Sequence, residues 1–176
     1  RFGFVILNYR TMDETMDCVK SIDEHIREAH EIVIVDNASP DGSGEKLRQV
    51  YDGRDDIKVI INADNLGYSC GNNAGIKQAR LDGCRYVVVL NSDTKVMQDE
   101  FCDIVRQEYR ANGYAVIGPQ IYKHGIPCCD NPGRDRAMSR FKLHIFIFMN
   151  RVFLALSYVA LDAVLNRIFN AYVEAK

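Results

Sequence analysis

Four groups of polar residues could do chemistry in this 176-residue chain, and each group directly follows an apolar run. They are Asn8-Tyr9-Arg10, Asp36-Asn37-Ala38-Ser39, the stretch 62–67 and Asn91-Ser92-Asp93-Thr94. Carboxylates and amides accept hydrogen bonds from ribose and base groups, and they supply the oxygen ligands that Mg²⁺ or Mn²⁺ prefers. A single acid after a strand could instead cap a helix or fix a turn. Four such groups together indicate a binding site.

Two carboxylates are expected to carry the binding. Asp36 follows Val-Ile-Val, a position from which it can accept hydrogen bonds from a ribose hydroxyl or a base imino group, so we expect the nucleoside there. Asp93 follows Val-Val-Val-Leu-Asn-Ser and would offer an oxygen ligand to Mg²⁺ or Mn²⁺ bound to a diphosphate. One carboxylate suffices if phosphates and waters complete the octahedron. Such a metal would neutralise charge on a departing diphosphate.

A glycine-containing stretch, 65–75, opens a predicted helix with small side chains. Glycines there let a ligand approach the backbone and the helix N-terminus. The sequence G-x-G-x-x-G does not follow the first predicted strand, and G-x-x-x-x-G-K-[ST] does not occur, so NAD enzymes and P-loop ATPases lose their main support. We expect a nucleotide held in another α/β manner.

The elements that must position these groups alternate between strand and helix. Apolar runs predict strands at 2–7, 31–35, 57–61, 86–90 and 114–117, with 86–90 expected to be the most buried. Apolar spacings of three or four predict helices over 12–26, around 47–50, over 69–81 and over 99–111. The alternation predicts a Rossmann-like α/β fold, with a mainly parallel sheet and helices on both faces. Ligands bind such sheets beyond the carboxyl ends of the strands, where strand order reverses.

Composition restricts the partners and the compartment. A net charge of −2 and a pI near 6.1 argue against binding to nucleic acid. The six cysteines lack C-x-x-C spacing, which favours reduced thiols in a cytoplasmic protein. The first residues run directly into a strand and contain no export signal.

Three segments are expected: a nucleotide-binding domain over 1–122, a loop over 123–137 and an apolar helical segment over 138–176. Charged and polar residues interrupt every window of the last segment that is long enough to span a bilayer. The helical segment could cover the sheet, form a homodimer, or make a peripheral contact with a membrane. All three alternatives remain open.

The motifs, taken in order and spacing, resemble those of a known family. They are Phe4-Val5-Ile6-Leu7-Asn8-Tyr9, the stretch 34–43, Asn65-Leu66-Gly67-Tyr68 with Asn72-Asn73-Ala74-Gly75, and Leu90-Asn91-Ser92-Asp93-Thr94. Together they closely resemble the family 2 inverting glycosyltransferases of GT-A fold. The similarity is closest to the bacterial rhamnosyltransferase-like branch that builds surface polysaccharides, and it extends from residue 2 to about residue 122.

This resemblance implies a donor, an acceptor and a location. The donor would be a nucleotide-diphosphate sugar, a UDP- or dTDP-sugar, and the acceptor a glycan or a lipid-linked glycan. The enzyme would work in the cytoplasm or at the inner face of the membrane. Asp36 would contact the base or ribose, Asn8 and Tyr9 would line the same pocket, and Asp93 would bind Mn²⁺ or Mg²⁺. The resemblance also implies nucleotide-sugar contacts from Asn37, Asn65, Gly67, Asn72, Asn73, Asn91 and Ser92.

One family motif has no match in this chain. Family members carry a later acidic motif whose carboxylate deprotonates the acceptor hydroxyl, and no acid after residue 120 has that context. The catalytic base is therefore unassigned, and we expect either a truncated chain or a divergent short homologue. Two alternatives are a donor-binding but catalytically incomplete module and a nucleotidyltransferase. A nucleotidyltransferase predicts a glycine-rich basic loop after the first strand, where residues 8–12 contain no glycine.

Overall fold

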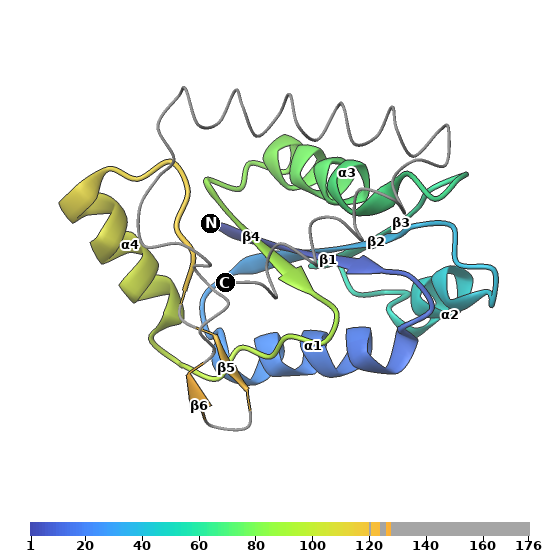
Figure 1. The fold of residues 1–176 in the computed structure, drawn as a ribbon, viewed down its shortest axis with the longest axis horizontal. Helices are drawn as coiled ribbons and strands as arrows, with labels where there is room; N and C mark the ends of the chain where they lie inside the picture. Colours follow the sequence, from blue (N-terminus) through green and yellow to red (C-terminus); the bar gives the residue numbers. More distant parts are fainter. Residues whose placement is uncertain (120, 124–125, 128–176) are drawn as a thin grey trace, which may run out of the picture. The chain divides into compact units, whose positions relative to one another are not determined.

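The structure is a computed structural model that describes residues 1–119, 121–123 and 126–127 (Figure 1). The chain divides into two compact units, Arg1–Tyr114 and Ala115–Lys176. The first unit holds the sheet and its helices. In the second, the described residues form a short antiparallel pair, β5 (Tyr122–Lys123) and β6 (Ile126–Pro127). The predicted helical segment over 138–176 lies outside the described residues.

A parallel four-stranded sheet is the centre of the first unit. Its strands are β1 (Phe2–Asn8), β2 (His30–Asp36), β3 (Ile57–Ile61) and β4 (Tyr86–Asn91), in the order β3-β2-β1-β4. Strand order reverses at β1, because β2 and β3 extend to one side of it and β4 lies on the other. In the register, Asn8 lies opposite Asp36 and Leu7 opposite Asn91. The carboxyl ends of β2, β1 and β4 therefore meet at one edge, next to the reversal where ligands bind such sheets.

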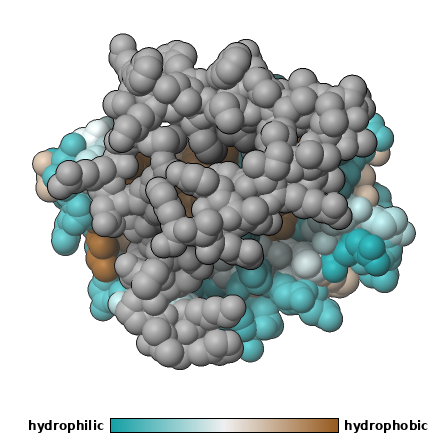
Figure 2. Space-filling view, in the orientation of Figure 1, coloured by the Kyte–Doolittle hydropathy of each residue, from teal (hydrophilic) through white to brown (hydrophobic). Residues whose placement is uncertain are grey.

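Helices cover both faces of this sheet, as predicted. Helices α1 (Met12–His25) and α2 (Ser43–Val50) lie below the sheet in Figure 1, and α3 (Gly67–Leu81) lies above it. Alternate strand residues point to opposite faces: Phe4 and Ile34 belong to a core with α1 and α2, whereas Val5 and Val35 pack with α3. The described surface over α1 and α2 is mostly hydrophilic (Figure 2), as expected for helices with one buried face.

Helix α4 (Phe101–Asn112) adds Cys102 to the same core as α1. Gly113 ends this helix in the left-handed conformation, with φ of 64°, and its N–H bonds to the carbonyl of Tyr109. Glycine is common at this position after a helix, because it adopts positive φ without steric cost.

Two strand predictions were wrong. Strand β4 is not the most buried, since Val89 is 41% exposed while the core residues of β1 and β2 are fully buried. The physical reason is position: β4 pairs with β1 on one side only among the described residues, and β1 lies between two strands. The stretch 114–117 forms no strand, and Val116 is 88% exposed. A short apolar run specifies a strand only where a neighbouring strand is available to pair with it.

Among the described residues, we find no helix that has both the length and the apolar character needed to cross a membrane.

Helix α3 approaches the sheet so closely that Gly75 faces the strands directly. A Cβ at this position would lie 2.4 Å from Val5 Cγ1 and 3.0 Å from Val35 Cγ2. We therefore expect Gly75→Ala to lower the free energy of unfolding by roughly 1–3 kcal/mol, because overpacking outweighs alanine's better helix propensity. Urea denaturation measures this change. Lys77→Ala, on the exposed side of the same helix, is the control, and equal stability of the two variants would contradict the predicted contact.

Candidate functional site

The side chain of Asn8 is the centre of a buried hydrogen-bond network at the carboxyl edge of the sheet. It is fully buried at the end of β1. Its Nδ2 donates to Asp36 Oδ1 at 2.6 Å and to Ser43 Oγ at 3.0 Å. Its Oδ1 accepts from the hydroxyls of Thr15 at 3.0 Å and Thr11 at 3.3 Å. One amide therefore joins β1 to the end of β2 and to the first turns of α1 and α2.

Both carboxylate oxygens of Asp36 accept hydrogen bonds from other residues of the protein. It is 1% exposed, and Oδ1 accepts from the hydroxyl of Ser39 at 2.6 Å as well as from Asn8. Its other oxygen, Oδ2, accepts from the backbone N–H of Ser39 at 2.9 Å. Gly44 lies against this carboxylate, since a Cβ there would come within 2.7 Å of Asp36 Cγ. The described contacts of Asp36 thus organise the 37–44 loop, and a direct contact with a nucleoside stays a prediction.

Two non-glycine residues next to this network have positive φ. They are Arg10, with φ of 61°, and Ala38, with φ of 59°. The left-handed region is sterically costly for residues with a Cβ, and such conformations cluster at functional sites. Ser39 joins the two loops, because its Oγ accepts the backbone N–H of Arg10 at 3.0 Å.

The network reaches the turn after β4 through Thr11. The Oγ1 of Thr11 lies 3.0 Å from Ser92 Oγ. A hydroxyl has one donor hydrogen, so Thr11 can donate to Asn8 while accepting from Ser92. A continuous path of hydrogen bonds therefore runs from Asp36 through Asn8 and Thr11 to Ser92, and both predicted groups lie at one edge of the sheet.

Asn37 fixes the loop after β3 to the end of β2. It is buried, and its Nδ2 donates to Asn65 Oδ1 at 2.7 Å and to the Gly67 carbonyl at 3.3 Å. Its Oδ1 accepts from Asn62 Nδ2 and from the backbone N–H of Leu66, both at 3.1 Å. With the path from Asp36 to Ser92, these bonds connect all four predicted polar groups to one another.

The first turns of α3 bring small residues and one tyrosine to the same edge. Gly71 packs on Leu7, because a Cβ there would lie 2.6 Å from Leu7 Cδ1. Asn72 is buried and donates to the Tyr68 carbonyl at 3.0 Å, whereas Asn73 is exposed. The Tyr68 hydroxyl donates to Asn91 Oδ1 at 2.8 Å. Helix α3 is thus joined to the end of β4.

Asp93 is exposed, and none of the described residues makes a hydrogen bond or ion pair with its carboxylate. Its negative charge acts on Cys18 of α1: burial, together with this charge, raises the pKa of the Cys18 thiol to about 12. An exposed carboxylate with open coordination positions has the chemistry of a ligand for a hard cation. The neighbouring Lys95 does not neutralise it, since Lys95 pairs with Asp17 at 2.7 Å.

Residues 95–106 lie along one side of α1 and its C-terminal extension. Besides Lys95 with Asp17, the contacts are Val96 N–H to Ser21 Oγ at 3.0 Å, His25 Nδ1 with Asp99 at 2.7 Å, and Arg106 with Glu28. The α1 positions 17, 21 and 25 recur every four residues, which places them on one face of the helix. This series of contacts continues the support that Thr11 gives to Ser92.

A second group of possible metal ligands lies at the opposite, amino edge of the sheet. Ligand atoms of Asp23, His30 and Asp56 lie within 4.8 Å of one another. Arg54 already forms ion pairs with both acids, at 3.0 Å and 2.7 Å. Since a guanidinium neutralises the two carboxylates, we interpret this cluster as structural and assign no metal to it.

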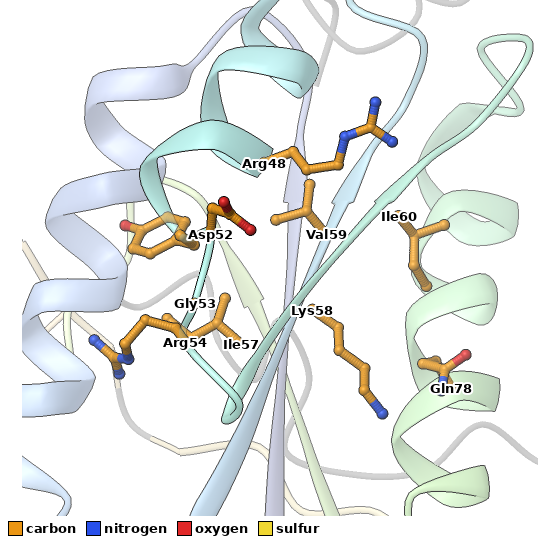
Figure 3. Close-up of a pocket in the computed structure, with 10 residues that line it drawn as sticks. Arg48, Asp52, Gly53, Arg54, Ile57, Lys58, Val59, Ile60 and Gln78 are labelled. Atoms are coloured by element: carbon orange, nitrogen blue, oxygen red, sulfur yellow. The ribbon is translucent and has the colours of Figure 1, made fainter.

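A hollow of about 400 Å³ lies along the outer side of β3 (Figure 3). Its three cations are engaged within the protein: Arg48 pairs with Glu45, Arg54 pairs with the acids named above, and Lys58 pairs with Glu31 and Asp82. None of the residues that the sequence predicted for the site lines this hollow. The convergence of strand ends at the reversal of strand order is the stronger indication of a ligand site.

The predicted site residues fall into two groups. Asn8, Asp36, Asn37 and Asn72 are buried and bonded within the protein, whereas Tyr9, Asn65, Gly67, Asn73, Asn91 and Asp93 are exposed, with Ser92 half-buried. Sequence reasoning missed the roles of Thr11, Thr15, Ser39, Ser43 and Tyr68. Ser39 had a local signal, a serine three residues after an aspartate, which is typical of side-chain to backbone turns.

Comparison with known families identifies the chain. A match to the family described as Glycosyl transferase family 2 covers residues 4–163. The chain belongs to glycosyltransferase family 2. This confirms the family that the four motifs indicated, and it removes the support for a nucleotidyltransferase.

The names of two curated relatives of this family 2 chain describe enzymes of glycan synthesis. It is 31% identical over 140 residues to the low-salt glycan biosynthesis hexosyltransferase Agl10 of Haloferax volcanii, covering 78% of this chain and 42% of that protein. It is 32% identical over 96 residues to a poly-beta-1,6-N-acetyl-D-glucosamine synthase of Staphylococcus aureus, covering 54% of this chain and 22% of that protein. The chain thus spans at most about two fifths of the length of these relatives.

Solved structures confirm the fold. Staphylococcus aureus TarS 1–349 in complex with UDP-GlcNAc has a TM-score of 0.52 at 18% identity, covering 69% of this family 2 chain and 40% of that one. The mannosyltransferase PcManGT of Pyrobaculum calidifontis, in complex with GDP-Man and Mn²⁺, has a TM-score of 0.56 at 16% identity, covering 70% and 36%. The predicted GT-A fold is therefore confirmed for the α/β unit.

Replacing Asp36 tests the buried network. In Asp36→Asn, an amide N–H₂ would face the N–H of Ser39 or the amide of Asn8, leaving a buried donor without an acceptor. We expect the free energy of unfolding to fall by about 2–3 kcal/mol, the cost of a lost buried hydrogen bond to a charged group. Urea denaturation measures it, with the exposed Asp64→Asn as the matched control. Equal stability of both variants would mean that the network contributes nothing to folding.

Proposed function

We propose that this chain is the donor-binding part of a metal-dependent glycosyltransferase that uses a nucleoside-diphosphate sugar. The observation that carries the proposal is the hydrogen-bonded path from Asp36 to Ser92, which holds the exposed Asp93 beside the reversal of strand order. Family membership supports transfer of a sugar as the reaction. The chain's short span relative to its relatives makes the activity of the whole protein part of this proposal.

A nucleotide would lie across the carboxyl ends of β1 and β4. Tyr9 is 42% exposed after β1 and offers an aromatic face for a base. Asn65 and Asn73 are exposed and offer polar side chains from the α3 side, and the missing side chain of Gly67 lets a ligand approach the backbone there. TarS was solved with UDP and UDP-GlcNAc, which supports the expectation of a UDP- or dTDP-sugar. The buried Asn8, Asp36, Asn37 and Asn72 would hold the loops that make these contacts.

Asp93 would hold Mn²⁺ or Mg²⁺. Its open coordination positions fit a hard cation whose remaining ligands are phosphate oxygens and water, and PcManGT was solved with Mn²⁺. The metal would supply electrostatic stabilisation of the diphosphate as it leaves. This chain's own contribution is to keep the Asp93 turn in place through Thr11 and Ser92.

Finer assignments belong to the same proposal. The rhamnosyltransferase-like branch is supported by Asn91 in the first position of the Asn91-Ser92-Asp93 motif. We propose a glycan or lipid-linked acceptor in surface polysaccharide synthesis, and a site of action in the cytoplasm or at the inner face of the membrane. A peripheral membrane contact or a homodimer through 138–176 remains a proposal too.

Calorimetric titration with UDP, dTDP and GDP tests the site. We expect UDP or dTDP to bind in Mn²⁺ and to bind at least roughly ten-fold more weakly in EDTA, because a metal bridge to a diphosphate adds over 1 kcal/mol. Asp93→Asn should remove this metal dependence, whereas Asp55→Asn, an exposed acid at the amino edge, should retain it. If a folded sample binds none of the three nucleotides, the proposal fails.

Cysteine labelling tests whether the start of α3 lines that site. Cys70 is exposed in the second turn, whereas Cys18, Cys84 and Cys102 are buried, and burial raises the pKa of Cys18 and of Cys102 to about 12. We expect iodoacetamide at pH 8 to label Cys70 first among these four, because thiolates are the reactive form, and UDP with Mn²⁺ to slow that labelling. Peptide mass spectrometry reports each site. Unchanged Cys70 labelling with UDP bound would place the nucleotide elsewhere.

A further inference from the structure

The contact between Tyr68 and Asn91 has a chemical consequence for the ligand. Tyr68 is the second residue of α3 and Asn91 is the last residue of β4, and both side chains are exposed, Tyr68 by 58%. The Tyr68 hydroxyl donates to Asn91 Oδ1 at 2.8 Å. An asparagine side chain has one acceptor oxygen and two N–H donors. With its oxygen bonded to Tyr68, Asn91 presents N–H donors to a ligand.

The backbone that carries the Tyr68 side chain is held in place by hydrogen bonds. Asn72 donates to the Tyr68 carbonyl, and Asn65 Oδ1 accepts the N–H of Gly67 at 2.9 Å. Asn37 in turn holds Asn65 at 2.7 Å. A hydroxyl carried by a backbone held in this way can select one orientation of the Asn91 amide, because hydrogen bonds are directional.

The turn that presents Asp93 is therefore held from both faces of the sheet. Thr11, at the start of α1, bonds to Ser92 on one side, and Tyr68, on α3, bonds to Asn91 on the other. Asp93 remains the carboxylate at this turn. A cation would take the oxygen of Asp93, and an anionic oxygen would match the N–H groups of Asn91.

We propose that Tyr68 is a positioning residue that orients the amide of Asn91 so that its N–H group donates to a phosphate oxygen of the bound nucleoside diphosphate. The inference rests on the proposed function and deepens it. It assigns opposite roles to the two ends of the Asn91-Ser92-Asp93 motif: Asn91 binds the anion and Asp93 binds the cation.

Two substitutions test this inference by UDP titration in Mn²⁺ and in EDTA. Tyr68→Phe removes only the hydroxyl and should weaken UDP binding roughly three- to ten-fold under both conditions, the usual range for one hydrogen bond. Asn91→Asp should weaken UDP binding in EDTA by more than roughly ten-fold, because a carboxylate repels phosphate. Electron paramagnetic resonance of free Mn²⁺ should give an unchanged affinity for Mn²⁺ alone in Tyr68→Phe. Tyr114→Phe, an exposed tyrosine at the end of the same unit, is the matched control and should bind UDP as the wild type does.

The outcomes separate the two proposals. If the folded wild type binds no nucleotide, the proposed function fails, and this inference fails with it. If the wild type binds UDP but Tyr68→Phe equals Tyr114→Phe, the positioning role alone is overturned. Unchanged or tighter UDP binding by Asn91→Asp in EDTA would mean that no N–H of Asn91 donates to a phosphate oxygen, and it would also overturn the inference. Circular dichroism confirms that each variant is folded.

Discussion

The amide of Asn8 must have all its hydrogen-bonding groups satisfied, because it is fully buried and an unpaired polar group in such a place costs roughly 1–3 kcal/mol. Its partners are Asp36 and Ser43 on one side and Thr11 and Thr15 on the other. They come from the end of β2 and from two helices, so the amide is satisfied only when these elements are in place. The geometry of the site is therefore part of the folding of the sheet.

The buried and the exposed site residues have different roles. The buried residues form hydrogen bonds that fix loops and strand ends; they are Asn8, Asp36 and Asn37. The exposed ones, with Tyr9 and Asp93 as examples, extend from those fixed loops toward solvent. Preorganisation of this kind lowers the entropy that binding must overcome, which explains why so many polar side chains at this edge bind one another.

Local patterns predicted most of the fold. The strand over 57–61 and the helices beginning near 12 and 69 follow from apolar spacing, which a single sequence carries. The burial of β4 and the run 114–117 were mispredicted because both depend on whether a neighbouring strand pairs with them. The polar groups at the strand ends could be predicted because each directly follows an apolar run. The hydrogen-bond partners of Asn8, however, lie up to 35 residues away in the sequence. Sequence spacing alone does not specify such pairs.

The contacts between α1 and residues 95–106 have a consequence for how this protein tolerates change. Their spacing matches the helical repeat, so each bond depends on the segment after β4 keeping its length and alignment. Loss of a single residue between Ser92 and Asp99 would misalign every later pair at once. Insertions and deletions should therefore be rare in this exposed segment during evolution, although surface loops usually accommodate them readily.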